Sequence, residues 1–184
     1  MPISTRDVRR RASKIQLLLM DVDGVLTDGR IFYVPRPGGG LVETKTFNSR
    51  DGLGIRFAHE AGLRTGVISG RRSPIVEHRI KELGIRYLRQ GVLDKLEPFR
   101  AILRAARLEA GAVCYVGDDL VDLPLLKRVG LAVGVADGHS LLRRHVHYCT
   151  KSPGGMGAIR EVVEIILAAQ GKFDHVMEYY LAEG

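Results

Sequence analysis

The segment LLLMDVDGVLTDG, residues 17–29, decides the fold of this chain. Its apolar start predicts a strand that is buried on both faces, as in a parallel sheet. Because residues i and i+2 of a strand point to the same side, Asp21 and Asp23 would aim at one spot near its carboxyl end, where open α/β sheets bind ligands. Two close carboxylates repel each other unless a cation, a proton or hydrogen bonds compensate. The segment therefore indicates a divalent metal and acid–base chemistry, with a plain Asp–Gly turn as the alternative.

The composition is typical of one globular domain. The chain has 184 residues, of which 45% are hydrophobic and 27% charged. No apolar run approaches the roughly 20 residues that span a bilayer, and the basic N-terminus lacks the apolar core of a secretory signal. The two cysteines, Cys114 and Cys149, belong to no metal-spaced pair, which favours reduced thiols. We therefore expect a single domain over residues 1–184, in the cytoplasm and without membrane contact.

The charge is strongly basic, with a formal net value of +7 and a pI of about 9.7. Such a balance permits nucleic-acid binding. The basic residues are spread along the chain, however, and no basic stretch is interleaved with aromatic residues that could stack on bases. We expect no nucleic-acid partner, and some of these cations to attract a small anionic substrate.

Strand-like and helix-like segments alternate through the chain, which predicts a doubly wound, Rossmann-like parallel α/β sheet with helices on both faces. A Pro/Gly cluster at 35–40 separates two strand-like runs, 30–34 and 41–47, and indicates a β-hairpin after the first strand. The expected sheet strands are 15–20, 65–69, 85–88, 112–116, 131–135 and 146–149. The expected helices are 4–13, from 48–52 to about 62, 73–83, 94–108, 121–129 and 156–170, with a helical turn at 140–144 and helical spacing in the tail 172–184.

Four polar groups follow successive predicted strands: Asp21 with Asp23, Ser69 with Arg71, Lys95, and Asp118 with Asp119. The carboxyl ends of parallel strands share one edge of a sheet, so these side chains can converge. A carboxylate pair, a hydroxyl, a cation and metal-binding oxygens together are what phosphoryl transfer requires.

These motifs resemble those of a known family. Residues 21–29 are similar to the first motif of the haloacid dehalogenase superfamily of aspartate-nucleophile phosphatases, and Ser69, Lys95 and Gly117-Asp118-Asp119 match its next three motifs in order. Phe47-Asn-Ser-Arg-Asp-Gly52 resembles a signature of the 3-deoxy-D-manno-octulosonate 8-phosphate phosphatases, a capless subfamily of lipopolysaccharide biosynthesis. The likeness extends over about residues 15–173.

The resemblance implies a magnesium-dependent phosphoric monoester hydrolase that works through an aspartyl-phosphate. Asp21 would be the nucleophile and a metal ligand, and Asp23 the acid and base, with its backbone carbonyl on the metal. Asp118 would be the third protein ligand to Mg²⁺, supported by Asp119, while Ser69 and Lys95 would hold phosphoryl oxygens. The candidates for binding the sugar acid are Asn48, Arg50, Asp51, Arg56, Arg71 and Arg79, together with Asp23 and Lys95.

Structural roles compete with these assignments. Ser69 could instead be a helix cap, Lys95 a surface lysine, and Asp119 only an N-cap for the next helix, whereas Asp122 is expected to be structural. Arg56 and Arg79 could be solvated helix arginines. The six histidines form no set with metal-ligand spacing.

The spacing between motifs leaves no room for a cap domain, because the first gap holds only the hairpin and the second only one helix and one strand. An uncapped site exposes the reaction to water. The resemblance implies a homotetramer in which hairpins pair and a neighbour's tail covers the site.

Two departures from the family's pattern bear on substrate specificity: a longer hairpin turn, and Met156 where the family commonly has arginine. A nonulosonate 9-phosphate is therefore the alternative substrate. The alternative classes of protein are a phospho-acceptor receiver domain and an idle binding module. Asp23 favours the enzyme over a receiver domain.

Overall fold

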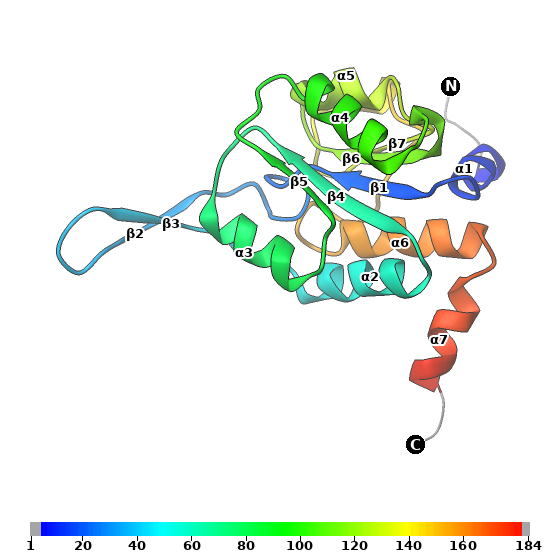
Figure 1. The fold of residues 1–184 in the computed structure, drawn as a ribbon, viewed down its shortest axis with the longest axis horizontal. Helices are drawn as coiled ribbons and strands as arrows, with labels where there is room; N and C mark the ends of the chain where they lie inside the picture. Colours follow the sequence, from blue (N-terminus) through cyan, green and yellow to red (C-terminus); the bar gives the residue numbers. More distant parts are fainter. Residues whose placement is uncertain (1–4, 182–184) are drawn as a thin grey trace.

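Six parallel strands form the central sheet in the computed structural model, which describes residues 5–181 (Figure 1). Their order is β5-β4-β1-β6-β7-β8, so the first strand lies in the middle of the sheet. Leu17 of β1 is in register with Arg64 on one side and Val113 on the other. The strands are β1 (Leu17–Met20), β4 (Arg64–Ser69), β5 (Tyr87–Gln90), β6 (Val113–Gly117), β7 (Leu131–Gly134) and β8 (Tyr148–Cys149). The predicted parallel α/β sheet is confirmed.

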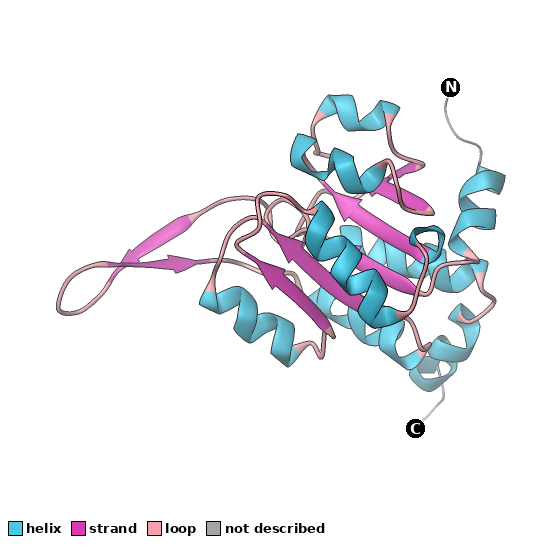
Figure 2. Ribbon diagram, turned by 45° about the horizontal axis from the view of Figure 1, so that its top comes forward, coloured by secondary structure: helices cyan, strands magenta, loops and turns pink. Residues whose placement is uncertain are grey.

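Helices cover both faces of this sheet (Figures 1 and 2). One face carries α1 (Thr5–Ala12), α2 (Ser49–Glu60), α3 (Pro74–Glu82) and α6 (Ala158–Ala169), and the other carries α4 (Leu96–Ala106) and α5 (Leu123–Leu126). Short 3₁₀ turns complete the connections: η1 (Ala110–Ala112), η2 (Leu120–Asp122) and η3 (Ser140–Arg144). Ser4, where we expected the first helix to begin, lies outside the described residues.

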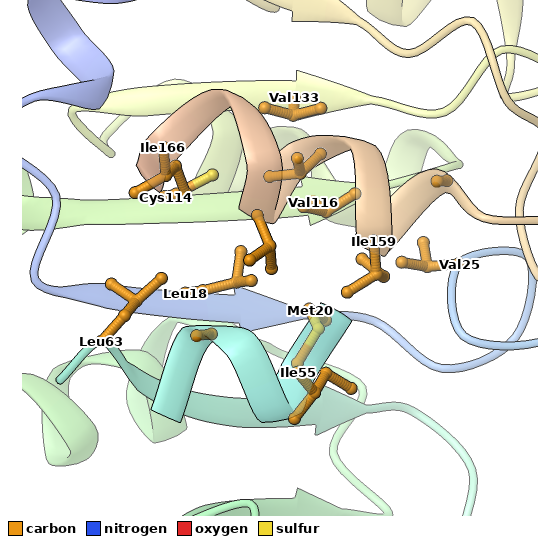
Figure 3. Close-up of a cluster of buried hydrophobic side chains, with 14 of the residues drawn as sticks. Leu18, Met20, Val25, Ile55, Leu63, Cys114, Val116, Val133, Ile159 and Ile166 are labelled. Carbon is orange, nitrogen blue, oxygen red and sulfur yellow. The ribbon is translucent and has the colours of Figure 1, made fainter. Parts of the chain in front are cut away.

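Strand β1 is buried on both faces, as its apolar run predicts. Leu18 and Met20 belong to the core beneath α2 and α6, whereas Leu17 and Leu19 belong to the core beneath α4. Figure 3 shows Leu18 and Met20 among the side chains that fill the space between the sheet and the first of these helix layers. All four residues have 0% exposure. The strand therefore ends in a rigid setting from which the following carboxylates project.

A two-stranded antiparallel hairpin, β2 (Phe32–Pro35) and β3 (Leu41–Thr44), extends from the domain beyond the carboxyl ends of the strands (Figure 1). This confirms the predicted hairpin. Large apolar side chains in its strands and just before β2 remain 41–64% exposed, namely Ile31, Phe32, Tyr33, Val34 and Leu41. Within the described chain the hairpin therefore lacks the apolar cover that the sheet has on both faces.

Element boundaries differ from expectation at turns. Strand β5 begins at Tyr87 rather than Ile85, because Ile85 still donates its N–H to Ile80 at the end of α3 and Gly84 has a φ of +66°. The helix expected over 121–129 is instead a 3₁₀ turn followed by the short α5. Helix α6 begins at Ala158 rather than Met156, after Gly157 with a φ of +105°. Glycines that need a left-handed conformation thus move two boundaries.

The tail forms α7 (Phe173–Leu181), which packs on its own chain. Val176 is buried, and the ring of Tyr180 lies 5.2 Å from that of Phe57. The helical spacing of the tail is thus confirmed over residues 173–181, and the implied place of the tail over a neighbour's site stays a prediction. Within residues 5–181, no helix combines the length and the apolarity that crossing a bilayer requires.

Candidate active site

Asp21 follows β1 directly, and the sheet holds its backbone in place. Its N–H donates to the carbonyl of Val116 over 3.0 Å, which continues the β1–β6 pairing one residue beyond the strand. The carboxylate accepts the N–H of Val22 at 2.7 Å and lies 2.9 Å from Nζ of Lys95. Burial raises the pKa of Asp21, although the charge of Lys95 opposes this effect. This carboxylate is fixed in direction and has a cation beside it.

Lys95, at the start of α4, points inward and its side chain is only 2% exposed. Its Nζ lies 2.7 Å from Oδ1 of Asp122 and donates to the hydroxyl of Tyr115 at 3.3 Å. Burial by itself would lower the pKa of Lys95, but the charges of Asp21 and Asp122 outweigh burial and raise it. A surface role for Lys95 is therefore wrong, and the side chain stays positively charged at the bottom of the site.

Asp118 follows β6 and completes a cluster of three carboxylates with Asp21 and Asp122, in which one oxygen of each lies within 4.8 Å of the others. Burial and the neighbouring carboxylates raise the pKa of Asp118 to about 8. Gly24 makes room for Asp118, because a Cβ at this glycine would lie 2.1 Å from Oδ2 of Asp118. Close carboxylates with raised pKa values are the electrostatic mark of a site that can take a cation.

Asp122 belongs to the framework of the cluster. Its Oδ1 accepts from Lys95 and, at 2.6 Å, from Tyr115, while its Oδ2 accepts the N–H groups of Asp118 and Asp119 at 3.0 and 3.3 Å. With both oxygens engaged and no exposure, Asp122 has the structural position we expected. Asp119 caps η2 through a bond of 2.7 Å from the N–H of Leu120, as its N-cap alternative predicts.

Each oxygen of Asp122 accepts two bonds, whereas among the described residues Oδ1 of Asp21 is bonded only to Val22 and Oδ2 only to Lys95. Asp21 and Asp118 are thus the two carboxylates of the cluster that keep lone pairs for a ligand. Hard oxygen donors on rigid strand ends suit Mg²⁺, which binds in proteins through one or two carboxylates and completes its shell with water or substrate oxygens. The residues present therefore fit a magnesium ion. The expected contribution of the Asp23 backbone carbonyl stays a prediction.

The Asp23 side chain is held apart from that cluster by residues at the base of the hairpin. Oδ1 of Asp23 is paired with Nζ of Lys45, and its Oδ2 lies 3.8 Å from Nε of Arg71. Glu43 joins the group, 3.5 Å from Lys45 and 2.6 Å from Arg71. Lys45 and Glu43 were not among the predicted site residues. Their signal was an acid and a base two residues apart in the expected strand 41–47, since residues i and i+2 of a strand point to the same side.

A pocket of about 240 Å³ opens above these groups. It brings together most of the predicted catalytic and phosphate-binding residues with an apolar rim; its lining is Asp21, Asp23, Ser69, Gly70, Arg71, Val92, Leu93, Lys95, Asp118, Asp119 and Val121. Ser69 is not a helix cap, because α3 begins at Pro74 with Ser73 at its N-cap position; its hydroxyl instead accepts the N–H of Arg71 at 3.4 Å. The pocket is thus open above and charged at its base.

A larger hollow, of about 740 Å³, lies at the opposite edge of the sheet, where β1 and β4 begin. Its lining includes Gln16, Arg64 and Gln170 but no carboxylate. Without a carboxylate it offers neither an aspartate nucleophile nor a group of metal-binding carboxylates, which the smaller pocket has.

Two other predicted substrate residues serve the fold. Asp51 is 2% exposed, and its carboxylate accepts the N–H groups of Gly157 and Arg160 at the start of α6. Asn48 caps α2 by accepting from Arg50 at 2.8 Å, and its amide donates to Gly155. The oxygens of Asp51 are thus engaged by helix α6 in its own chain, and the substrate-binding role expected of Asp51 stays a prediction.

The arginines outside the pocket face elsewhere in their own chain. Arg50 is exposed, Arg56 pairs with Glu60 on the surface of α2, and Arg79 pairs with Glu82 at 2.9 Å and lies over the ring of Phe47. The exposed position expected of Arg56 as an alternative is observed. None of the three lines the pocket of its own chain.

The comparisons with known proteins agree with this geometry. Residues 51–130 match the model of the haloacid dehalogenase-like hydrolases. The 3-deoxy-D-manno-octulosonate 8-phosphate phosphatase of Escherichia coli K12 is 46% identical over 173 residues, covering 94% of this chain and 89% of the relative. The enzyme of that name from Yersinia pestis has a solved structure with a TM-score of 0.86 at 45% identity, covering 91% of this chain and 89% of the other.

A third similar protein bears on the ligands. The 3-deoxy-D-manno-octulosonate 8-phosphate phosphatase of Moraxella catarrhalis, solved with magnesium, phosphate and KDO, has a TM-score of 0.90 at 37% identity. The match covers 96% of this chain and 99% of that one.

Proposed function

This chain belongs to the family of 3-deoxy-D-manno-octulosonate 8-phosphate phosphatases, within the haloacid dehalogenase-like hydrolases, and we propose that it hydrolyses that sugar-acid phosphate. The observation that carries the proposal is the Asp21–Lys95–Asp118 cluster at the base of an open pocket, with Asp23 at its side. Membership in a hydrolase family argues against a receiver domain or an idle binding module.

The first chemical step is the attack of an Asp21 carboxylate oxygen on phosphorus. A bond forms between that oxygen and phosphorus while the bond from phosphorus to the sugar oxygen breaks, which leaves an aspartyl-phosphate. Asp23 donates its proton to the departing sugar oxygen. Lys95, 2.9 Å from Asp21, carries positive charge where the phosphoryl oxygens would gather, and the Ser69 hydroxyl is the candidate for a further bond to them.

The second step restores the enzyme. Asp23, now a carboxylate, takes a proton from a water molecule, and the water oxygen forms a bond with phosphorus. The bond from phosphorus to Asp21 breaks, so that inorganic phosphate leaves and both carboxyl groups return to their starting states. One residue acts as acid and then as base, which requires its carboxyl group to stay in one position through both steps.

The residues that would hold Mg²⁺ are Asp21, Asp118 and the backbone carbonyl of Asp23. When bound, the ion supplies positive charge that neutralises the phosphoryl oxygens. The protein contributes a preformed ligand pair, because Lys95, Tyr115 and Asp122 lock the cluster from below.

Arg71 is the candidate to recognise the sugar acid within a single chain, since its side chain is 43% exposed at the pocket. Guanidinium groups bind carboxylates through paired hydrogen bonds. Met156 is 54% exposed at a position where the family commonly has arginine, so a related nonulosonate 9-phosphate is the second candidate substrate.

The assembly we propose is a homotetramer in the cytoplasm, built through the hairpins. The exposed apolar residues of β2 and β3 support it, because an apolar patch without cover is typical of an interface. In such an assembly Asn48, Arg50, Arg56 and Arg79 remain candidates for substrate binding. The unpaired Cys114 and Cys149 support a reducing compartment.

A phosphate-release assay tests the function. Protein with Mg²⁺ is offered a panel of phosphorylated sugar acids, including the octulosonate 8-phosphate and a nonulosonate 9-phosphate, and Asp21→Asn is the matched variant. We expect highest kcat/KM on the octulosonate ester and a loss of more than about a thousandfold in Asp21→Asn, because the amide is a poor nucleophile. Unchanged turnover in that variant would remove the nucleophile, and a receiver domain would accept phosphate without multiple turnovers.

A further inference from the structure

Lys45 is a buried cation beside a hairpin in which Phe32, Tyr33, Val34 and Leu41 are exposed. Its side chain has 0% exposure, although β3 ends one residue before it and the next residue, Thr46, is exposed. Removing an ammonium group from water costs several kcal/mol unless ion pairs compensate. The ion pairs of Lys45 must therefore offset the free-energy cost of burying its ammonium group.

The contacts of Lys45 point at the acid–base residue. Its Nζ is paired with Oδ1 of Asp23 and lies 3.5 Å from Oε1 of Glu43. That Glu43 oxygen is buried and has no hydrogen-bond partner of its own among the described residues, so the pairing with Lys45 is its compensation. Lys45 therefore joins one oxygen of Asp23 to an anchor on the hairpin.

Arg71 forms a second bridge between Asp23 and Glu43. It lies 2.6 Å from Oε2 of Glu43 and 3.8 Å from Oδ2 of Asp23, so the two carboxylates are bridged by two cations. Burial alone would raise the pKa of Glu43, but its bond to Arg71 and the charge of Lys45 outweigh burial and lower it, which keeps Glu43 an anion. Of the two bridges, that of Lys45 is buried and that of Arg71 is 43% exposed. The bridge through Lys45 is therefore the one shielded from solvent.

We propose that Lys45, anchored by Glu43, is a positioning residue that holds the Asp23 carboxyl group toward the leaving oxygen of the substrate. This inference rests on the proposed phosphatase function and adds a second role for the hairpin, whose base completes the acid–base machinery of its own chain. Lys45 touches neither substrate nor metal in this role. It acts through Asp23, so its removal should harm only steps that need a well-placed acid.

Substrates with different leaving groups can distinguish a positioning role of Lys45 from a purely structural one. A sugar alkoxide is a poor leaving group and needs a proton from Asp23, whereas p-nitrophenolate leaves without one. The value of kcat/KM reports the steps through cleavage of the ester bond and excludes hydrolysis of the aspartyl-phosphate. The ratio of kcat/KM for an alkyl phosphate to that for p-nitrophenyl phosphate therefore measures how well the acid is placed.

The experiment compares wild type, Lys45→Met, Lys45→Arg and the control Lys81→Met, which removes an exposed lysine of α3. Each value is taken on the plateau of that variant's pH profile. For Lys45→Met we expect about a hundredfold loss of kcat/KM on the sugar phosphate and a change within about threefold on p-nitrophenyl phosphate. Lys45→Arg, which keeps the cation, should recover part of the sugar-phosphate rate, and Lys81→Met should match wild type.

Equal losses on both esters would overturn the proposal, since a disturbed fold or a damaged nucleophile harms both. In an Asp23→Asn background Lys45→Met should cause no further loss on the sugar phosphate, and additive losses would also contradict it. If Lys45→Met fails to fold, Glu43→Gln gives the same test. A loss of kcat/KM on the alkyl ester alone supports the proposal, and a ratio of the two kcat/KM values equal to that of wild type overturns it.

The substrate assignment can fail separately. Any alkyl phosphate that wild type hydrolyses can replace the octulosonate ester in this ratio. Wild-type inactivity on that ester, with turnover of another, would remove the proposed substrate and leave the role of Lys45 to be decided by the remaining comparison.

Discussion

The burial of polar and apolar side chains at the sheet edge is the opposite of that in the hairpin. At the sheet edge, the charged groups of Asp21, Lys95 and Asp122 are buried against one another above an apolar core. In the hairpin, apolar side chains such as Val34 and Leu41 are exposed, while the nearby Lys45 is turned inward. Within the described chain, the sheet edge has its partners and the apolar surface of the hairpin has none.

We therefore propose that the sheet edge carries the catalytic groups and that the arms of the hairpin serve assembly. The buried charges compensate one another, so the nucleophile and the cation beside it need nothing from a second copy. The hairpin has residues of both kinds: its base supports Asp23, and its arms present the apolar surface we assign to an interface. Changes to the sheet edge should therefore act on catalysis directly, and changes to the arms of the hairpin should act through assembly.

The largest effect is expected at Asp118. Asp118→Asn removes one of the two carboxylates proposed to hold the metal ion, so turnover should fall by at least about a hundredfold and the rise in Tm on adding Mg²⁺ should disappear. Asp174→Asn, at an exposed position of α7, is the control and should keep both. The measurements are phosphate release and thermal unfolding with and without magnesium. An Asp118→Asn protein that still gains stability from Mg²⁺ would contradict the assigned ligand set.

The pH dependence of the metal-free protein follows from the same residue. The pKa of Asp118 is raised from 3.8 to about 8, so between these values the folded state holds a proton that the unfolded state has lost. The contribution of this group to stability therefore falls as pH rises through that interval. Asp118→Asn should raise Tm above wild type in metal-free buffer at alkaline pH and match it in acid. Mg²⁺ displaces the proton, so its affinity should weaken as pH falls below about 8.

A smaller effect is expected from the arms of the hairpin. Val34→Asp with Leu41→Asp places charges on an exposed apolar surface, which should dissociate the assembly into monomers and lower turnover about tenfold by uncovering the site. The stability of one copy should change by only about 0.5 kcal/mol, because both positions are exposed. Light scattering and phosphate release measure the result, with Leu141→Asp in η3 as the exposed-leucine control. A monomeric wild type with full activity would end the tetramer proposal.

The smallest effect on turnover is expected at Tyr115. Tyr115→Phe removes the hydroxyl that donates to Asp122 over 2.6 Å but leaves Lys95 paired with Asp21. Denaturant unfolding should show a loss of about 1.5–3 kcal/mol, typical of a hydrogen bond to a charged group. Turnover should fall only a few-fold, since the nucleophile keeps its cation. A loss of turnover as large as that of Asp118→Asn would mean that the hydroxyl takes part in the chemistry.

Periodicity and strand-end residues were enough to predict the sheet and the base of the site. The apolar run before Asp21 is buried on both faces, and Asp21, Ser69, Lys95 and Asp118 meet at one edge because parallel strands end there. Local rules also predicted the hairpin from its Pro/Gly turn. Element ends were less accurate, because Gly84 and Gly157 adopt conformations that no hydrophobic pattern records.

The sequence by itself determined the fold class, the family and the two carboxylates, Asp21 and Asp118, that we propose hold a metal ion, because each depends on motifs and their spacing along the chain. Only the tertiary structure decided which polar side chains face the pocket. It turned Asp51 toward the N-terminus of α6, which lies more than a hundred residues further along the chain, and brought Lys45 to Asp23 across the base of the hairpin. A side chain's partner across such a separation is set by how the elements pack, and packing leaves no trace in local periodicity.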